Sequence, residues 1–225
     1  MSEQNRFLFF LVFHLSLHNL LFGEEKDRET QDYELFYQED FENIALGKLP
    51  DDFFILDGDF SVVNMEGKKC LELSAQPVGE HGFLFGPRLK FGSFELSFSC
   101  LGGSRSRRHN MVAGNLGGVR GFKYQLNPSR QEVLFTFQED WQHGQGIEWS
   151  SLNWMQVKVQ VDTDPKKMVS KIRMLVQKEA KMESIKQVSW ISLDDVIAGG
   201  KCMLWGYCYA DFPVYWDNLI IRSKN

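Results

Sequence analysis

The sequence predicts an all-β protein: an antiparallel two-sheet β-sandwich of the jelly-roll type, with at most one or two short helical turns. Residues 91–100 alternate apolar and polar side chains, which is the period of a strand with one buried face. Residues 155–162 repeat this alternation almost residue for residue. Further short strand-like segments are separated by turn residues, and no long stretch has the 3.6-residue period of a helix. Many short strands with regular turns favour a sandwich.

Turn residues delimit the strands in the first half of the chain. A turn containing Gly47 and Pro50 precedes a strand, and Asp57, Gly58 and Asp59 form the turn into the next one. A hairpin turn then follows at 66–68. The strands expected here are 53–56, 60–64, 70–74, 83–85 and 91–100. In the last of these, the apolar positions should face a core, and we expect water or a shallow groove beside Ser93, Glu95, Ser97 and Ser99.

The second half of the chain has a less regular strand pattern. The glycine-rich stretch 101–118 reads as a long loop or as a weak strand around Met111. Residues 178–187 suggest an exposed polar excursion, and Ser192 to Gly199 resembles a capped single turn of helix, with a hydroxyl at its start and a glycine at its end. The remaining expected strands are 121–127, 132–138, 154–162, 172–176, 202–207 and 216–222.

Length and charge limit the classes of protein. A chain of 225 residues is long enough for one sizeable core, and we expect one domain over residues 33–225. The formal net charge is −5. Basic residues are spread out except at Arg105, Arg107 and Arg108, so no electrostatic footprint for nucleic acid exists. A nucleic-acid partner is not expected.

The N-terminus has the pattern of a secretory signal peptide over residues 1–23. Arg6 precedes an apolar run, 7–17, that is shorter than the about 20 residues of a membrane span. Leu21 is large for a position just before a cleavage site, so an uncleaved N-terminal anchor is the alternative, and it would be the one membrane contact. Residues 24–32 form a charged spacer. The expected location is secreted or periplasmic.

Four short motifs carry a resemblance to a known superfamily. They are Asp40-Phe-Glu42, Gly47-Lys-Leu-Pro50, Gly58-Asp-Phe-Ser-Val62 and Tyr215-Trp-Asp-Asn-Leu-Ile-Ile221. Over residues 33–225 the chain resembles the concanavalin A-like lectin/glucanase superfamily, which includes LamG and laminarinase-like jelly rolls. The resemblance implies that the first and last strands lie side by side and that the concave sheet is of a kind that often binds saccharides.

The sequence lacks the catalytic pattern of the enzymes in this superfamily, which favours a non-catalytic member. Laminarinase-like hydrolases of that superfamily carry acidic residues at alternate positions of one strand, because two carboxyl groups must work together about 5–5.5 Å apart in a retaining enzyme. Glu139 and Asp140 are adjacent and point apart on a strand, and Asp57 and Asp59 belong to a turn. We expect a carbohydrate-binding module; the alternatives are a glycoside hydrolase with an unorthodox site and a structural or adhesion module that binds protein.

Aromatic residues supply the first candidates for a saccharide or glycan site. Trp141 and Trp149 flank a glycine-containing stretch that we expect to be a loop, and an aromatic ring beside amide groups suits the C–H face and polar rim of a sugar. For both tryptophans, packing in the core is an equal alternative, and for Trp154 it is the favoured one. The second group of candidates comprises Tyr124, Gln125, Asn127 and Arg88.

The cysteines and one implied cation complete the expectations. An even number of cysteines in an exported chain allows disulfides, with a plain buried thiol as the alternative for Cys100; the four are Cys70, Cys100, Cys202 and Cys208. The superfamily resemblance also implies a structural Ca²⁺ where the first and last strands meet, held by Glu42 and Asp217. The alternative for Asp217 is a turn cap or a hydrogen bond to a neighbouring strand. No other cofactor is expected.

Overall fold

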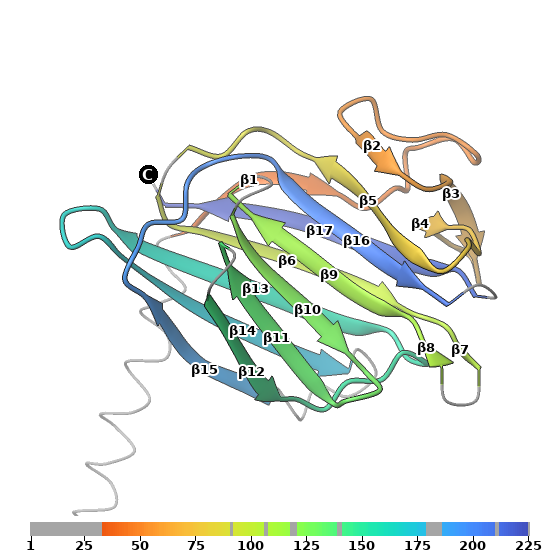
Figure 1. Cartoon of the computed structure of the whole chain (residues 1–225). Coiled ribbons are helices and arrows are strands. Elements are labelled where there is room, and N and C mark those ends of the chain that lie inside the picture. Colours follow the sequence, from red (N-terminus) through yellow and green to blue (C-terminus); the bar gives the residue numbers. More distant parts are fainter. Residues whose placement is uncertain are drawn as a thin grey trace, which may run out of the picture. The chain divides into compact units, whose positions relative to one another are not determined.

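A computed structural model describes residues 33–90, 92–105, 108–117, 121–138, 141–178, 186–209 and 212–224 (Figure 1). Leu35–Ser223 form one compact unit, outside which lie the described residues Tyr33, Glu34 and Lys224. The expected signal peptide, 1–23, and spacer, 24–32, lie outside the described residues. Within the part of the chain that is described, no helix is long and apolar enough to cross a membrane.

Two antiparallel sheets form a β-sandwich, which confirms the predicted fold class. We name each sheet after a central strand. The β6 sheet has the order β15–β14–β13–β6–β17–β4–β3, and β1 also pairs with β17. Its strands are β1 (Glu34–Glu39), β3 (Phe60–Met65), β4 (Lys68–Leu73), β6 (Phe94–Leu101), β13 (Met155–Asp164), β14 (Val169–Lys178), β15 (Lys186–Leu193) and β17 (Val214–Ser223). The pairing of β1 with β17 places the first and last strands side by side, as the resemblance implied.

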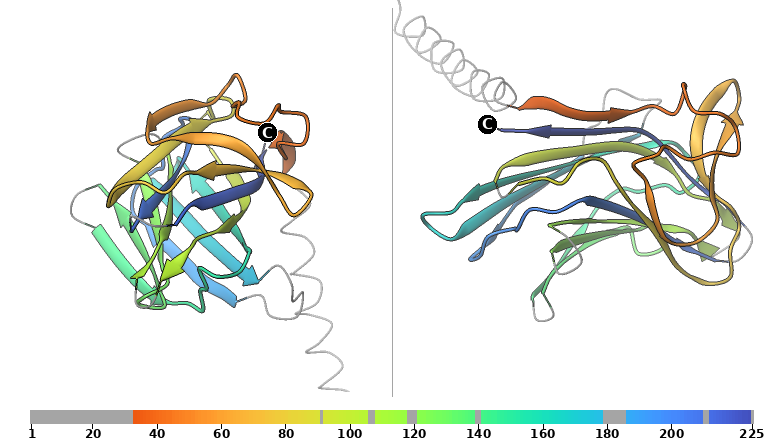
Figure 2. Two further views of the ribbon diagram at one scale, coloured as in Figure 1. Left: turned by 90° about the vertical axis from the view of Figure 1, so that its right-hand side faces the viewer. Right: turned by 90° about the horizontal axis from the view of Figure 1, so that it is seen from above.

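The β10 sheet forms the second layer (Figure 2). Its order is β12–β11–β10–β9–β16–β5–β2. The strands are β2 (Phe54–Asp57), β5 (Gly79–Phe85), β9 (Met111–Leu116), β10 (Phe122–Asn127), β11 (Glu132–Phe137), β12 (Trp141–Gly146) and β16 (Cys202–Cys208). A separate hairpin pairs β7 (Ser104–Arg105) with β8 (Arg108–His109).

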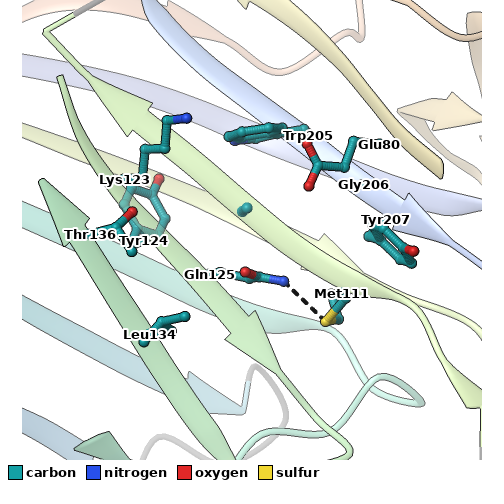
Figure 3. A pocket seen from close by; sticks show the side chains of 11 residues that line it. Glu80, Met111, Lys123, Tyr124, Gln125, Leu134, Thr136, Trp205, Gly206 and Tyr207 are labelled. Atoms are coloured by element: carbon teal, nitrogen blue, oxygen red, sulfur yellow. Dashed lines mark hydrogen bonds between the residues drawn. The ribbon is translucent and has the colours of Figure 1, made fainter. Parts of the chain in front are cut away.

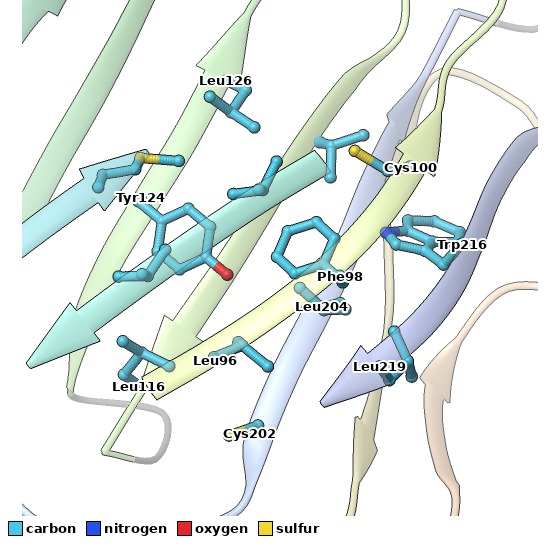
Figure 4. Packing of buried hydrophobic residues seen from close by; sticks show 14 of the residues in the cluster. Leu96, Phe98, Cys100, Leu116, Tyr124, Leu126, Cys202, Leu204, Trp216 and Leu219 are labelled. Atoms are coloured by element: carbon cyan, nitrogen blue, oxygen red, sulfur yellow. The ribbon is translucent and has the colours of Figure 1, made fainter. Parts of the chain in front are cut away.

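Aromatic side chains from the inner faces of both sheets meet in the core. Phe98 of β6 stacks against Tyr124 of β10 with ring centroids 6.5 Å apart. Phe83 of β5 meets Trp216 of β17 edge-on at 5.6 Å. Phe98 and Tyr124 lie among leucines from β6, β9, β10 and β16 (Figure 4). All four rings are completely or almost completely buried, so they remove large apolar areas from water and hold the two sheets together.

The polar face of β6 differs from the prediction. Phe94, Leu96, Phe98 and Cys100 face the core as expected, but Glu95, Ser97 and Ser99 are also buried, at 4%, 5% and 2% exposure. β6 is flanked on both sides, by β13 and β17. Their long side chains cover it: Lys158 Nζ lies 3.3 Å and Arg222 Nη1 3.1 Å from Glu95 Oε1. The prediction that these residues lie beside water or a groove is therefore wrong. Glu95 can be buried because its charge is paired.

Strand pairing corrects two local predictions and decides a third. Ser192 lies in β15 opposite Lys171 of β14, so the predicted helical turn is wrong at its start. In the stretch 101–118, β9 starts at Met111 and confirms the strand that was expected there as the alternative to a long loop; it pairs on both sides with β10 and β16. Trp141 begins strand β12 and pairs with Phe137, whereas a loop was expected there. At Ser192 and Trp141, ladder hydrogen bonds outweigh a weak local pattern.

All four cysteines are buried, and none forms a disulfide. The disulfides that their even number allowed are absent from the structure, and the plain buried thiol expected as the alternative for Cys100 is confirmed. Burial raises the pKa of the Cys202 thiol to about 12. Burial also raises the pKa of the Cys208 thiol, to about 11, against a backbone hydrogen bond that lowers it. A thiol with a raised pKa forms little thiolate near neutral pH and is a poor nucleophile.

Substitutions at Tyr124 and Gly114 test how tightly the sheets are packed. The Tyr124 hydroxyl is buried without a hydrogen-bond partner in the described structure, and a Cβ on Gly114 would lie 2.1 Å from it. Tyr124→Phe should leave the free energy of unfolding unchanged or raise it by up to about 1 kcal/mol. Gly114→Ala should lower it by about 1–3 kcal/mol through the clash. Urea denaturation measures both, and a large loss in Tyr124→Phe would show that the hydroxyl is paired.

Candidate functional site on the outer face of the β10 sheet

The alternation of side chains along β10 and β16 determines which of them lie on the outer face of the sheet. On β10, Phe122, Tyr124 and Leu126 are buried, whereas Lys123 and Gln125 are partly exposed. On β16, Trp205 and Tyr207 are partly exposed between buried neighbours. Because successive side chains of a strand point to opposite faces, these four polar and aromatic groups share the outer face of the sheet.

Small residues make this face hollow beside Trp205. In the strand register, Trp205 lies opposite Gly82 on β5 and opposite Ala113 on β9. Neither neighbour has a side chain larger than a methyl group, so no bulky side chain stands beside the indole on these two strands. The resulting hollow has a volume of about 160 Å³ (Figure 3). Its lining consists of Glu80, Met111, Ala113, Lys123, Tyr124, Gln125, Leu134, Thr136, Trp205, Gly206 and Tyr207.

Lys123 and Gln125 supply polar groups to the hollow. Lys123 Nζ lies 5.4 Å from the centroid of the Trp205 ring, a cation–π distance. Gln125 Nε2 donates a hydrogen bond to Met111 Sδ at 3.2 Å. A thioether is a weak acceptor, so this amide can exchange it for a better one. Trp205 Nε1 is buried and has no acceptor in the described structure.

The hollow carries one cation and one carboxylate that do not neutralise each other. Glu80 is on β5 and Lys123 on β10, and in the sheet order both β16 and β9 lie between these strands. Neither side chain forms an ion pair with another described residue. An aromatic ring with an amide, a hydroxyl and charged groups around it can stack on an apolar ring face and hydrogen-bond its rim.

The sequence-predicted residues of β10 and the segment after β5 are placed as follows. Gln125 lines the hollow. Asn127 faces the same side at the end of β10, where its Oδ1 accepts the Arg130 N–H at 3.2 Å. Tyr124 also borders the hollow, but its side chain is buried in the core and cannot contact a ligand on the outer face. Arg88 is exposed outside the hollow.

The two predicted tryptophans do not form a site together. Trp149 is 3% exposed, and both its backbone N–H and its backbone carbonyl bind the side chain of Gln131, at 3.2 and 2.8 Å. Trp149 lies in the loop after β12, as expected, but its side chain is buried, so ligand contact is wrong for it and the core alternative holds. Trp141 lies opposite the largely buried Phe137, packs against the core and stacks on His143 at 6.2 Å.

Sequence reasoning missed Trp205, Lys123 and Tyr207. The strand over 202–207 was expected, but its residues are nearly all apolar or aromatic, so the alternation does not show which side faces outward. For β10 the available pattern was clearer. Lys123 and Gln125 alternate with Phe122, Tyr124 and Leu126, and this period could have excluded Tyr124 and added Lys123.

Glu42 and Asp217, the residues implied for Ca²⁺, already have protein partners. Glu42 Oε1 accepts the Lys69 N–H at 3.1 Å, and Lys69 Nζ donates to the carbonyls of Glu42 and Ile44, both at 2.8 Å. Asp217 Oδ1 accepts the Asn218 N–H at 2.7 Å within its own strand, β17. The Lys69 ammonium thus already binds two backbone carbonyl oxygens at Glu42 and Ile44. Among the described residues, no group of three acidic, His or Cys side chains is arranged for a metal.

Calcium binding therefore stays a prediction with a direct test. Binding to the folded state alone should raise the melting temperature in millimolar Ca²⁺ over that in excess chelator, since a ligand stabilises the state it binds. Asp217→Ala should then abolish the rise. Identical melting curves of the unmodified protein in Ca²⁺ and in chelator would contradict the prediction and leave both carboxylates with their local hydrogen bonds.

Comparison with known proteins shows a likeness in fold. No family model matches the chain, and neither does the sequence of any curated protein. Arcelin-5, a lectin-like defence protein from Phaseolus vulgaris, has a TM-score of 0.55 at 8% identity, over 80% of this chain and 95% of its own. Lectin II from Ulex europaeus has a TM-score of 0.57 at 8% identity, over 85% and 100%. The Emp47p carbohydrate recognition domain has 0.53 at 10%, over 87% and 99%. The chain thus has the lectin-like β-sandwich fold that was predicted.

Proposed function

We propose that this protein is an exported, non-catalytic carbohydrate-binding protein whose saccharide occupies the hollow on the outer face of the β10 sheet. The observation that carries the proposal is the Trp205 indole, which stands between Gly82 and Ala113 with polar side chains around it. Solved structures with the same fold support a saccharide ligand, since they include a lectin complexed with galactose and a carbohydrate recognition domain.

The chemistry of the hollow suits a sugar ring. The flat indole offers an apolar surface for ring C–H groups, while Gln125, Thr136 and Glu80 offer an amide, a hydroxyl and a carboxylate for sugar hydroxyls. A volume of about 160 Å³ is below the about 300–1,000 Å³ of sites for drug-sized ligands. The hollow therefore fits one ring-sized unit, which can belong to a longer glycan extending over the sheet.

Binding is favoured over glycoside hydrolysis by the lining of the hollow. Hydrolysis by the common mechanisms needs two carboxyl groups across the scissile bond, about 5–5.5 Å apart in retaining and about 6.5–9.5 Å apart in inverting enzymes. Glu80 is the one carboxylate among the described residues that line the hollow. With a single such group, the hollow can hold a hydroxyl, but it lacks the second carboxyl group of an acid–base or acid–nucleophile pair.

Replacing Trp205 tests the proposed site, with Trp141 as the matched control. Trp205→Ala removes the stacking surface and should weaken saccharide binding at least tenfold, since aromatic anchors carry much of the binding energy. Trp141→Ala removes an equally large side chain from the same sheet, on its core-facing side, and should leave the affinity unchanged. A glycan array finds the ligand, and isothermal titration with melting curves separates lost affinity from lost stability. Unchanged binding in Trp205→Ala would move the site elsewhere.

Export is the second part of the proposal. It rests on Arg6 and the apolar run at 7–17, which have the order and length of a signal peptide. Intact-mass analysis of the protein made in an exporting host should show loss of roughly the first 23 residues. Recovery of the full-length chain from the cytosol would contradict export, whereas a full-length chain in the membrane fraction would support the alternative of an uncleaved anchor.

A further inference from the structure

We infer that the saccharide is acidic: the hollow selects a sugar ring with one anionic group, a carboxylate or a sulfate ester, bound at Lys123. This inference rests on the proposed function and deepens it by naming the chemical class of the ligand. It starts from the one cation that lines the hollow, among the residues that the structure describes.

Three lysine and arginine side chains of the described structure pair with carboxylates, whereas Lys123 does not. On the β6 sheet, Lys158 and Arg222 share the buried Glu95, at 3.3 and 3.1 Å, and Lys167 pairs with Asp164 at 3.2 Å. Lys123 has no carboxylate within ion-pair distance in the described structure, and its ammonium lies over the Trp205 ring instead. A partly buried ammonium without a counter-ion favours an anionic ligand beside it.

The position of Lys123 over the indole discriminates against neutral sugars. A ring that stacks on Trp205 competes with the ammonium, which lies 5.4 Å from the ring centroid. Displacing it forfeits a cation–π contact, which corresponds to about a two- to fivefold loss of affinity at an exposed site. An acidic sugar returns a charge-assisted hydrogen bond to the same ammonium, and such bonds are about twice as strong as neutral ones. A neutral sugar returns a weaker one.

Glu80 fixes the number and the position of the anionic group. Tyr207 of β16 lies opposite Glu80 of β5, and β16 separates β5 from β9 and β10 in the sheet. Figure 3 shows the Trp205 ring between Lys123 and Glu80. A carboxylate accepts hydrogen bonds from sugar hydroxyls and repels a second negative charge. The ligand should therefore place its acidic group toward Lys123 and neutral hydroxyls toward Glu80.

The test compares matched glycans on an array that holds neutral, uronic acid, methyl-esterified and sulfated versions of the same backbones. The ligands found are then titrated by calorimetry. An acidic glycan should bind at least tenfold tighter than its neutral or esterified counterpart. Preference for the uronate or for the sulfate ester tells which anionic group the hollow takes. Strongest binding to neutral glycans would overturn the inference, whereas binding of no glycan would overturn the proposed function itself.

Variants of Lys123 separate local charge from net charge. Lys123→Met should remove the preference for the acidic glycan, and Lys123→Arg should retain most of it. Lys171→Met is the control, because it makes the same change in net charge at an exposed position of β14, on the other sheet. A preference for the acidic glycan that survives in Lys123→Met would contradict the inference, provided that the melting temperature is unchanged.

The salt dependence of the affinity is an independent test. Attraction by Lys123 and repulsion by the net charge change the affinity in opposite directions as salt rises. The formal net charge of −5 repels an acidic glycan, and this repulsion weakens as salt screens it. Contact with the Lys123 ammonium instead weakens as salt rises. Affinity for the acidic glycan should therefore fall severalfold between about 0.01 and 0.15 M salt, over which the Debye length shrinks from about 30 to about 8 Å. An affinity that rises with salt would contradict the role of Lys123.

Discussion

The stacking of Phe98 against Tyr124 across the two sheets decides what the outer face of the β10 sheet can present. Tyr124 must point inward to meet Phe98, and the missing side chain of Gly114 leaves room for its phenol ring. Its neighbours in sequence, Lys123 and Gln125, must then point outward. A slip of one residue in the pairing of β10 would exchange these faces, burying the ammonium and exposing the aromatic ring. The position of the candidate site therefore depends on the packing of the core.

The sequence allowed the fold to be predicted because the alternation is strong along β6 and β13, which are neighbours inside the β6 sheet. β6 and β13 were recognised from it, whereas on β10 the neighbours Tyr124 and Gln125 were both named as site candidates although they point to opposite faces. The alternation could not show how much of the polar face of β6 would be covered by side chains of other strands. Glu95 was expected near water, yet it is 4% exposed, because Lys158 and Arg222 reach it from strands that are distant in sequence.

The candidate site was harder to predict than the fold, for two physical reasons. Trp149 follows a glycine-containing stretch, but Gln131 binds its backbone on both sides and holds it in the core, a contact that no local pattern reveals. Trp205 lies in a strand of mostly apolar residues, where periodicity carries no information about direction. Its exposure becomes evident from the register, which places Gly82 and Ala113 beside it.

The location of the hollow on strands has a consequence for how rigid it is. Trp205, Ala113, Gln125 and Leu134 belong to four neighbouring strands and form one row across the sheet. Strand positions are held by hydrogen bonds on both sides, unlike the loop that was expected to carry the site. Binding residues on such elements are already ordered, so less conformational entropy is lost when a ligand is bound.

The position of β17 has a consequence for how the chain reaches this structure. β17 is the last strand in chain order, yet it lies between β6 and β4 and also pairs with β1. Its Arg222 meets Glu95 across 127 positions of sequence. Pairings between segments so far apart form slowly, and the β6 sheet cannot close before β17 is available. Until then β6, β4 and β1 each keep an open edge, and this intermediate is the one most exposed to pairing with other chains.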